Sequence, residues 1–76
     1  MDTGLMWFDN DPKTNIASKI EQAIAVYKKK FGITPDLCLI NPKMFGESLT
    51  SVNGVTVKQY QQILPWHFWL GMTDSI

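Results

Sequence analysis

The fold is decided by residues 5–40, which read LMWFDNDPKTNIASKIEQAIAVYKKKFGITPDLCLI. The apolar runs Leu5–Phe8 and Leu37–Ile40 open and close this segment, and both have the length and the bulky side chains of buried strands. Between them, apolar residues recur at helical spacing and fall within an arc of about 100°. The segment therefore predicts a strand, a long amphipathic helix and a second strand.

The helix is predicted to run from Pro12 to Phe31. Pro12 suits the first helical position, where its missing N–H needs no partner, and it makes Asp11 the expected N-cap. Gly32 favours the left-handed conformation that ends helices, and Pro35 prevents the helix from continuing. The apolar face consists of Ile16, Ile20, Ala23, Ile24, Tyr27 and Phe31.

The remainder of the chain is predicted to be rich in β-structure. Asn53-Gly54 lies between short apolar runs and favours a two-residue hairpin turn. Pro65 interrupts the next run, which indicates two short strands or an edge strand bent at the proline. In the last strand, alternation places Trp66, Phe68 and Leu70 on one face of the sheet and His67 and Trp69 on the other.

Together these elements predict one small α/β (α+β) domain over residues 1–76, with its core at about 4–71 and a frayed tail at 72–76. A β-α-β unit is followed by a β-rich C-terminal third, and the helix packs on a small single-layer sheet. Lys43–Ser48 is expected to form a short helical turn. For a chain of 76 residues, burial and ordering entropy nearly cancel, so self-association is an inexpensive source of further stability.

The composition argues against several classes of function. The seven cationic side chains are all lysines and are balanced by seven acidic ones, so neither a global charge nor an arginine fork favours nucleic acid. No apolar stretch reaches the length of a membrane span, and Met1 to Met6 lacks the pattern of a signal peptide, which predicts a cytoplasmic protein. One cysteine and one histidine cannot form a structural zinc site, and we expect no cofactor.

Two carboxylates follow the first apolar run. Leu5 to Asp11 resembles the opening motif of haloacid dehalogenase-type phosphotransferases, in which an apolar strand precedes Asp-x-Asp and then a hydroxyl residue. Lys13 stands at the hydroxyl position, Thr14 comes one residue late, and that fold needs a much longer chain. The motif is therefore incomplete and does not predict phosphotransfer.

Asp9 and Asp11 have a structural and a functional interpretation. Capping of the helix and neutralisation of its dipole account for both carboxylates without any chemistry. Alternatively, the carboxyl ends of neighbouring strands in a β-α-β unit gather Asp9, Asp11 and Asn41 at one edge, where a small polar ligand or a divalent cation could bind.

Three further features have modest functional alternatives. Cys38 lies inside an apolar strand and is expected to be a buried, unreactive core residue. His67 has no nucleophile or orienting partner that would make a catalytic group of it. Lys28-Lys29-Lys30 complements the helix dipole, and its alternative is weak, non-specific binding of single-stranded nucleic acid.

The C-terminal aromatic side chains are the hardest to bury in the core of a domain this small. If one face of the last strand packs on the helix, Trp69 and its neighbours need other cover, either the loop from Lys43 to Val52 or another chain. We therefore predict a non-catalytic protein-interaction module, acting as a homodimer or as an accessory or inhibitory subunit through its C-terminal aromatic strand. The predicted interface residues are Trp7, Tyr60, Trp66, His67 and Trp69.

Overall fold

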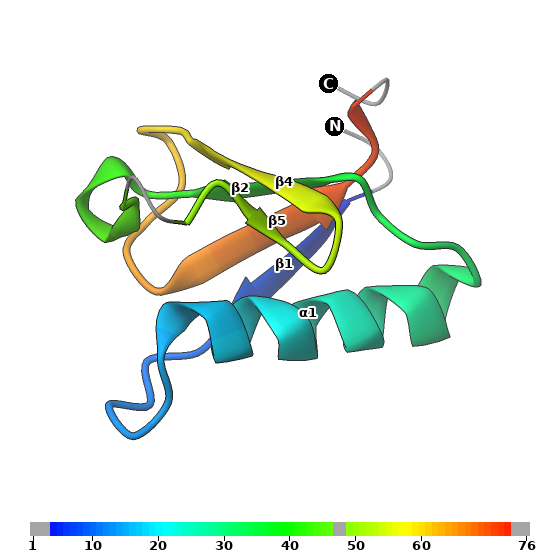
Figure 1. Cartoon of the computed structure of the whole chain (residues 1–76), viewed down its shortest axis with the longest axis horizontal. Coiled ribbons are helices and arrows are strands. Elements are labelled where there is room, and N and C mark those ends of the chain that lie inside the picture. Colours follow the sequence, from blue (N-terminus) through cyan, green and yellow to red (C-terminus); the bar gives the residue numbers. More distant parts are fainter. Residues whose placement is uncertain (1–3, 47–48, 74–76) are drawn as a thin grey trace.

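The computed structural model describes residues 4–46 and 49–73. One helix, α1 (Ile16–Phe31), lies along one face of a mixed sheet of five strands (Figure 1). This arrangement confirms the predicted α+β fold with one helix on a single-layer sheet. The other elements are β1 (Leu5–Phe8), β2 (Leu37–Ile40), the 3-10 helix η1 (Pro42–Met44), β3 (Ser51–Val52), β4 (Val55–Gln59) and β5 (His67–Gly71).

The sheet has the strand order β1-β5-β2-β4-β3. Both β1 and β2 pair antiparallel with β5, so β1 and β2 run parallel to each other with β5 between them. The predicted β-α-β unit is therefore present in split form, with the last strand of the described residues inserted into it. Of the two predicted alternatives around Pro65, two short strands are confirmed, because β4 and β5 lie on either side of that proline. An edge strand bent at Pro65 is wrong, because the proline lies in a turn before β5, and β5 is an interior strand.

The hairpin prediction is confirmed. β3 and β4 pair antiparallel, with Val52 opposite Val55, and Asn53 and Gly54 form the turn between them. Both turn residues have positive φ, 51° and 81°, which asparagine and glycine tolerate better than other residues. β4 in turn pairs parallel with β2 and carries the sheet to its far edge.

The predicted start of the helix is wrong by one turn. α1 begins at Ile16, and its N-cap is Asn15, whose side chain accepts a hydrogen bond from Ser18 N at 2.8 Å. Asp11 instead accepts from Lys13 N, which stabilises a tight turn over Pro12 and Lys13. The local preferences of Asp11-Pro12 are thus satisfied by a turn, and Asn15 caps the helix in its place. The predicted end is confirmed, because Gly32 is left-handed at φ 75° and its N–H donates to Lys28 O.

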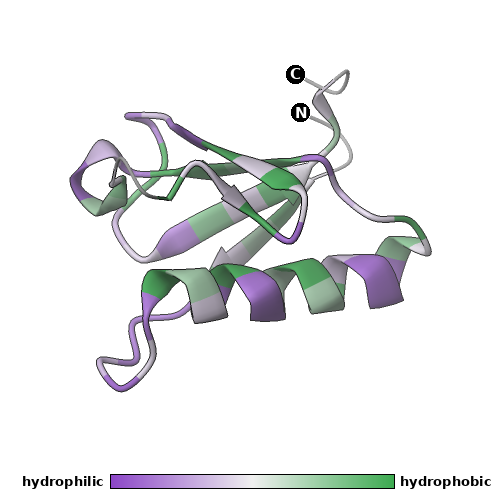
Figure 2. Ribbon diagram, in the orientation of Figure 1, coloured by the Kyte–Doolittle hydropathy of each residue, from purple (hydrophilic) through white to green (hydrophobic). Residues whose placement is uncertain are grey.

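The main core lies between α1 and the sheet. Figure 2 shows the hydrophobic residues of α1 gathered on the side that faces the strands. As predicted, Phe68 and Leu70 of β5 point to this side, and Cys38 and Ile40 of β2 join them. β2 is buried along its whole length, as its apolar sequence indicates. β1 is not, because it is an edge strand whose residues alternate between half-buried and exposed.

A second, smaller core covers part of the other face of the sheet. It consists of Leu37, Leu39, Ile63 and Trp69. The loop from Lys43 to Val52 was one predicted cover for Trp69, but Met44 and Val52 belong to the helix side. Ile63, from the connection between β4 and β5, covers Trp69 instead.

Two glycines make room for the Trp69 indole. A methyl group built on Gly4 or on Gly71 would overlap the Trp69 ring. Because both positions lack a side chain, the ring can approach the backbone of both glycines closely, and Trp69 is only 4% exposed. Trp69 is therefore buried within its own chain, and its predicted role as an interface anchor is corrected.

The end of the described chain is held to the sheet. The Thr73 backbone N–H and side-chain hydroxyl both donate to Asp36 Oδ1, at 2.7 and 3.0 Å. The prediction of a frayed tail is therefore wrong for Thr73, while residues 74–76 lie outside the described part. Of the predicted turn at Lys43–Ser48, residues 43–44 are helical as part of η1, and residues 47–48 are not described. Within the described residues, no helix is long and apolar enough to span a membrane.

Candidate functional site

The two aspartates that follow β1 surround a buried lysine. Lys19, in the first turns of α1, is 0% exposed, and its ammonium donates to Asp9 Oδ1 at 3.2 Å and to Thr14 Oγ1 at 2.7 Å. It also donates to the backbone carbonyl of Asp11. Three oxygens from the segment between β1 and α1 thus hold one cation, and the buried charge is both paired and hydrogen-bonded. We call these residues, Asp9, Asp11, Thr14 and Lys19, the Lys19 network.

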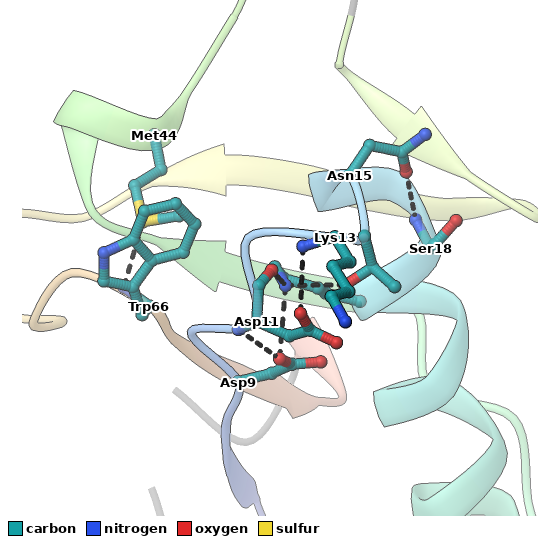
Figure 3. A network of polar contacts seen from close by, with 9 residues as sticks. Asp9, Asp11, Lys13, Asn15, Ser18, Met44 and Trp66 are labelled. Carbon is teal, nitrogen blue, oxygen red and sulfur yellow. Dashed lines mark hydrogen bonds and ion pairs between the residues drawn. The ribbon is translucent and has the colours of Figure 1, made fainter.

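The loop that forms this network is shaped by its own side chains. Asp9 Oδ1 accepts from Asp11 N at 2.9 Å, and Asp11 Oδ1 accepts from Lys13 N at 2.9 Å. Figure 3 shows the two bonds in series along the loop, ahead of the cap between Asn15 and Ser18. Side-chain bonds to a backbone N–H two residues ahead favour tight turns. The loop therefore curls, and the Asp11 carbonyl and Thr14 hydroxyl reach the lysine.

The Lys19 network lowers the pKa of Asp9 below its ordinary value of 3.8. The hydrogen bond from the Asp11 backbone is the largest cause, and the bond and charge of Lys19 act in the same direction against partial burial. A lowered pKa stabilises the fold above the ordinary pKa, and this contribution disappears as the pH falls through the lower, folded value.

We accordingly expect the urea midpoint to fall as the pH drops below the ordinary pKa of 3.8, and to fall less steeply in Asp9→Asn than in the natural chain. Urea titrations followed by far-ultraviolet circular dichroism at a series of pH values provide the measurement. Asp36→Asn is the comparison that removes a carboxylate elsewhere. Equal slopes for the natural chain and Asp9→Asn would contradict the assignment.

Trp66 lies beside the Lys19 network. Its backbone carbonyl accepts from Asp9 N at 3.0 Å, and its backbone N–H donates to the Met44 sulfur at 2.9 Å. Its ring centroid lies 5.8 Å from the Lys19 ammonium. Figure 3 shows Trp66 against Met44. Trp66 also has φ 65°, which is rare for a bulky residue, and it lies just before β5 rather than in the strand. Its ring is partly exposed but lies near Lys19 of α1, on the helix side of the sheet that Phe68 and Leu70 also face.

Asn41 does not share the network of Asp9 and Asp11. Its amide donates to Ile63 O at 2.9 Å, and its oxygen accepts from Lys43 N at 2.9 Å. Asn41 therefore caps η1 and anchors the connection before β5. Because β5 separates β1 from β2, the strand ends that carry Asp9 and Asn41 are about 10 Å apart.

The oxygens at this edge already bind a cation, the Lys19 ammonium. Lysine ammonium occupies the position that a metal ion would take among the Asp9, Asp11 and Thr14 oxygens. Over residues 4–46 and 49–73, no group of three or more His, Cys, Asp or Glu side chains could hold a metal. Sequence reasoning missed Lys19, although the spacing from Ile16 and Ile20 places it beside the apolar stripe, where a lysine needs a partner.

The predicted aromatic interface is divided by the structure. Trp7 is half-buried against the main core, with its indole N–H buried and without an acceptor among the described residues. Tyr60 is exposed, and its hydroxyl donates to Gln62. His67 is half-buried, and its ring lies 4.8 Å from that of Phe8, its partner across the strands. Trp66 and Tyr60 are thus exposed, His67 and Trp7 partly so, and Trp69 is not.

Two large apolar side chains that were not predicted as interface residues are exposed on β1. Met6 is 51% exposed and Phe8 55% exposed. Because Leu5 and Trp7 pack toward the helix, Met6 and Phe8 point to the opposite, helix-free face. We call the outer edge of β1, together with the side chains of Met6, Phe8 and His67, the β1 surface. The sequence predicts Leu5–Phe8 to be a buried strand, and it therefore does not predict this surface.

The lysine cluster is exposed at the end of α1. Lys28, Lys29 and Lys30 occupy the last turn, where their charges complement the helix dipole. The Lys30 ammonium lies 5.5 Å from the ring centroid of Phe31, which is partly exposed itself. Nucleic-acid binding by this cluster stays a prediction.

Cys38 is buried between the helix and the sheet, and burial raises the pKa of its thiol from 9.0 to about 12. Because the thiolate is the reactive form, we expect native Cys38 to react with Ellman's reagent at pH 8 about a thousandfold more slowly than in urea. The contribution of the neutral thiol to stability is present below pH 9 and is lost as the pH rises toward 12. Equal rates in native and unfolded protein would contradict this placement.

No family model, curated protein or solved structure matches this chain. Its function is therefore inferred from the geometry described above.

Proposed function

We propose that this chain is a non-catalytic protein-interaction module that binds its partner through the β1 surface. The observation that carries the proposal is the exposure of Met6 and Phe8 side by side on an edge strand. Sheet edges that bind no other chain are usually protected by charges, prolines or bulges. β1 reads Leu-Met-Trp-Phe and contains none of these.

The C-terminal aromatic strand contributes to this surface through His67. Its ring packs on Phe8, and the buried Trp69 lies opposite Met6 across the two strands. A rigid apolar patch at a sheet edge suits the addition of a strand from another protein, in which main-chain hydrogen bonds supply affinity and side chains supply specificity. This partner can be a second copy or a larger protein of which the chain is an accessory or inhibitory subunit. The free Cys38 thiol is compatible with the predicted cytoplasmic location.

The alternative site at Asp9, Asp11 and Asn41 is less well supported. Asp9 and the Asp11 carbonyl already hold the Lys19 ammonium, and the Asn41 amide is engaged elsewhere. A ligand would have to displace a buried, paired cation before it could bind.

Photo-crosslinking in cells tests the proposal directly. The chain is produced with benzoylphenylalanine in place of Phe8, and in a control in place of Ile33, which is 53% exposed beyond the end of α1. We expect a discrete crosslinked species from position 8 and none from position 33. The mass of the crosslinked species from position 8 distinguishes a second copy from a different protein. Absence of any adduct at position 8 would reject the β1 surface as a contact site.

A further inference from the structure

We propose that the partner of the β1 surface is a second copy of this chain, joined to the first through antiparallel pairing of the two β1 strands about a two-fold axis. This inference rests on the proposed function and specifies its partner. The outer edge of β1 can accept another strand, because β5 is its only strand neighbour in the described chain.

The free hydrogen-bonding groups on β1 can be assigned to particular residues. Asp9 N donates to Trp66 O, which places Asp9 in a hydrogen-bonded pair with β5. In antiparallel strands, hydrogen-bonded and non-hydrogen-bonded residue pairs alternate. The backbone N–H and C=O groups of Leu5 and Trp7 therefore also point toward β5. The backbone N–H and C=O groups of Met6 and Phe8 therefore point outward from the sheet.

Symmetry then limits the possible registers. A two-fold axis perpendicular to the sheet keeps Met6 and Phe8 of both copies on the helix-free face. The register with Met6 opposite Phe8 of the second copy makes two hydrogen-bonded pairs, so the four outward N–H groups of Met6 and Phe8 all find acceptors. Registers with Met6 opposite Met6, or Phe8 opposite Phe8, form only one such pair within β1.

The same register also brings the exposed side chains of the two copies into contact. Each exposed Met6 lies against an exposed Phe8 of the second copy, with their Cβ atoms about 5 Å apart, so two half-exposed apolar side chains are covered at once. Sulfur–aromatic contacts of this kind are favourable. No charge opposes the contact, because β1 carries none and the chain has a net charge of +0. The two sheets become one continuous sheet, which removes an unprotected edge.

Two measurements test this arrangement, and the first is sedimentation equilibrium of the natural chain and of Phe8→Lys. We expect a dimer whose dissociation constant rises at least about a hundredfold in Phe8→Lys, because the variant places two lysines in each interface. Ile33→Lys, with the same change at an equally exposed position, is expected to dimerise like the natural chain. Circular dichroism checks that both variants are folded.

The second measurement fixes the register by oxidation of cysteine variants. A mixture of Met6→Cys and Phe8→Cys proteins is expected to form a disulfide-linked dimer, whereas either protein alone is not, since its two cysteines would be more than about 7 Å apart. Buried Cys38 does not interfere. Equal crosslinking by a single variant would overturn the register.

A strictly monomeric natural chain would overturn the second copy as partner. If the chain were monomeric but position 8 still gave a crosslinked adduct with another protein in cells, the proposed function would stand and only this inference would fail. A monomer without any adduct would remove both.

Discussion

Trp69→Ala is expected to lower the free energy of unfolding by about 3–5 kcal/mol, the largest effect of any single substitution considered. The indole is almost fully buried against Leu37, Leu39 and Ile63, and removing it leaves a cavity over the middle of the sheet. A domain of this size has a total stability of about 4–11 kcal/mol, so the variant is expected to lose much of its folded population at 37 °C.

Urea unfolding followed by circular dichroism at a fixed protein concentration measures the loss. Trp66→Ala is the matched control, because Trp66 is 40% exposed and its removal is expected to cost less than about 1.5 kcal/mol. Gly71→Ala is expected to destabilise the fold in the same direction but less, since the added methyl overlaps the indole, which can shift but is not removed. Equal losses for the two tryptophan variants would contradict the assignment of Trp69 to the core.

Lys19→Met is expected to cost about 2–3 kcal/mol, the second largest effect. Methionine keeps most of the apolar stem but removes the ammonium, so Asp9 Oδ1, Thr14 Oγ1 and the Asp11 carbonyl lose their shared donor. The result therefore isolates the polar contribution of the network from its packing contribution.

Lys29→Met is the control for this substitution, because Lys29 lies on the same helix and is exposed. Its effect is expected to remain within about 0.5 kcal/mol. Both variants are compared by urea unfolding at pH 7, and Lys19→Met is also followed to acid pH, where its midpoint should depend less on pH than that of the natural chain. Equal stabilities for the two variants would show that the network adds nothing to the fold.

The elements that periodicity and turn chemistry define were predictable from the sequence. The body of α1, its end at Gly32, the buried strand β2 and the Asn53-Gly54 hairpin all follow from local patterns. The start of α1 was not, because Asp11-Pro12 and Asn15 both have the properties of a helix start. Local preference alone does not decide between them. In the fold, Asn15 caps the helix, and the Lys19 ammonium binds the carbonyl of Asp11 in the preceding loop.

Strand order was beyond local reasoning. The position of β5 between β1 and β2 depends on contacts between residues far apart in the chain, such as Leu5 with Leu70 and Leu37 with Gly71. Once β5 is interior, Trp69 is buried and β1 becomes an edge, which moves the exposed apolar surface to Met6 and Phe8. The candidate site was half predictable: Asp9 and Asp11 stood out as paired carboxylates, but their partner Lys19 did not.

The split order of the sheet also affects when the chain can fold during its synthesis. β5 is made last but lies between β1 and β2, so the sheet cannot close until residues 67–71 have emerged from the ribosome. Until then α1 can form but has no finished surface to pack on, and β1 has no strand beside it. The sheet should therefore not be complete before β5 is available, and a ribosome that stalls before residue 67 should hold a chain that proteases still cut readily.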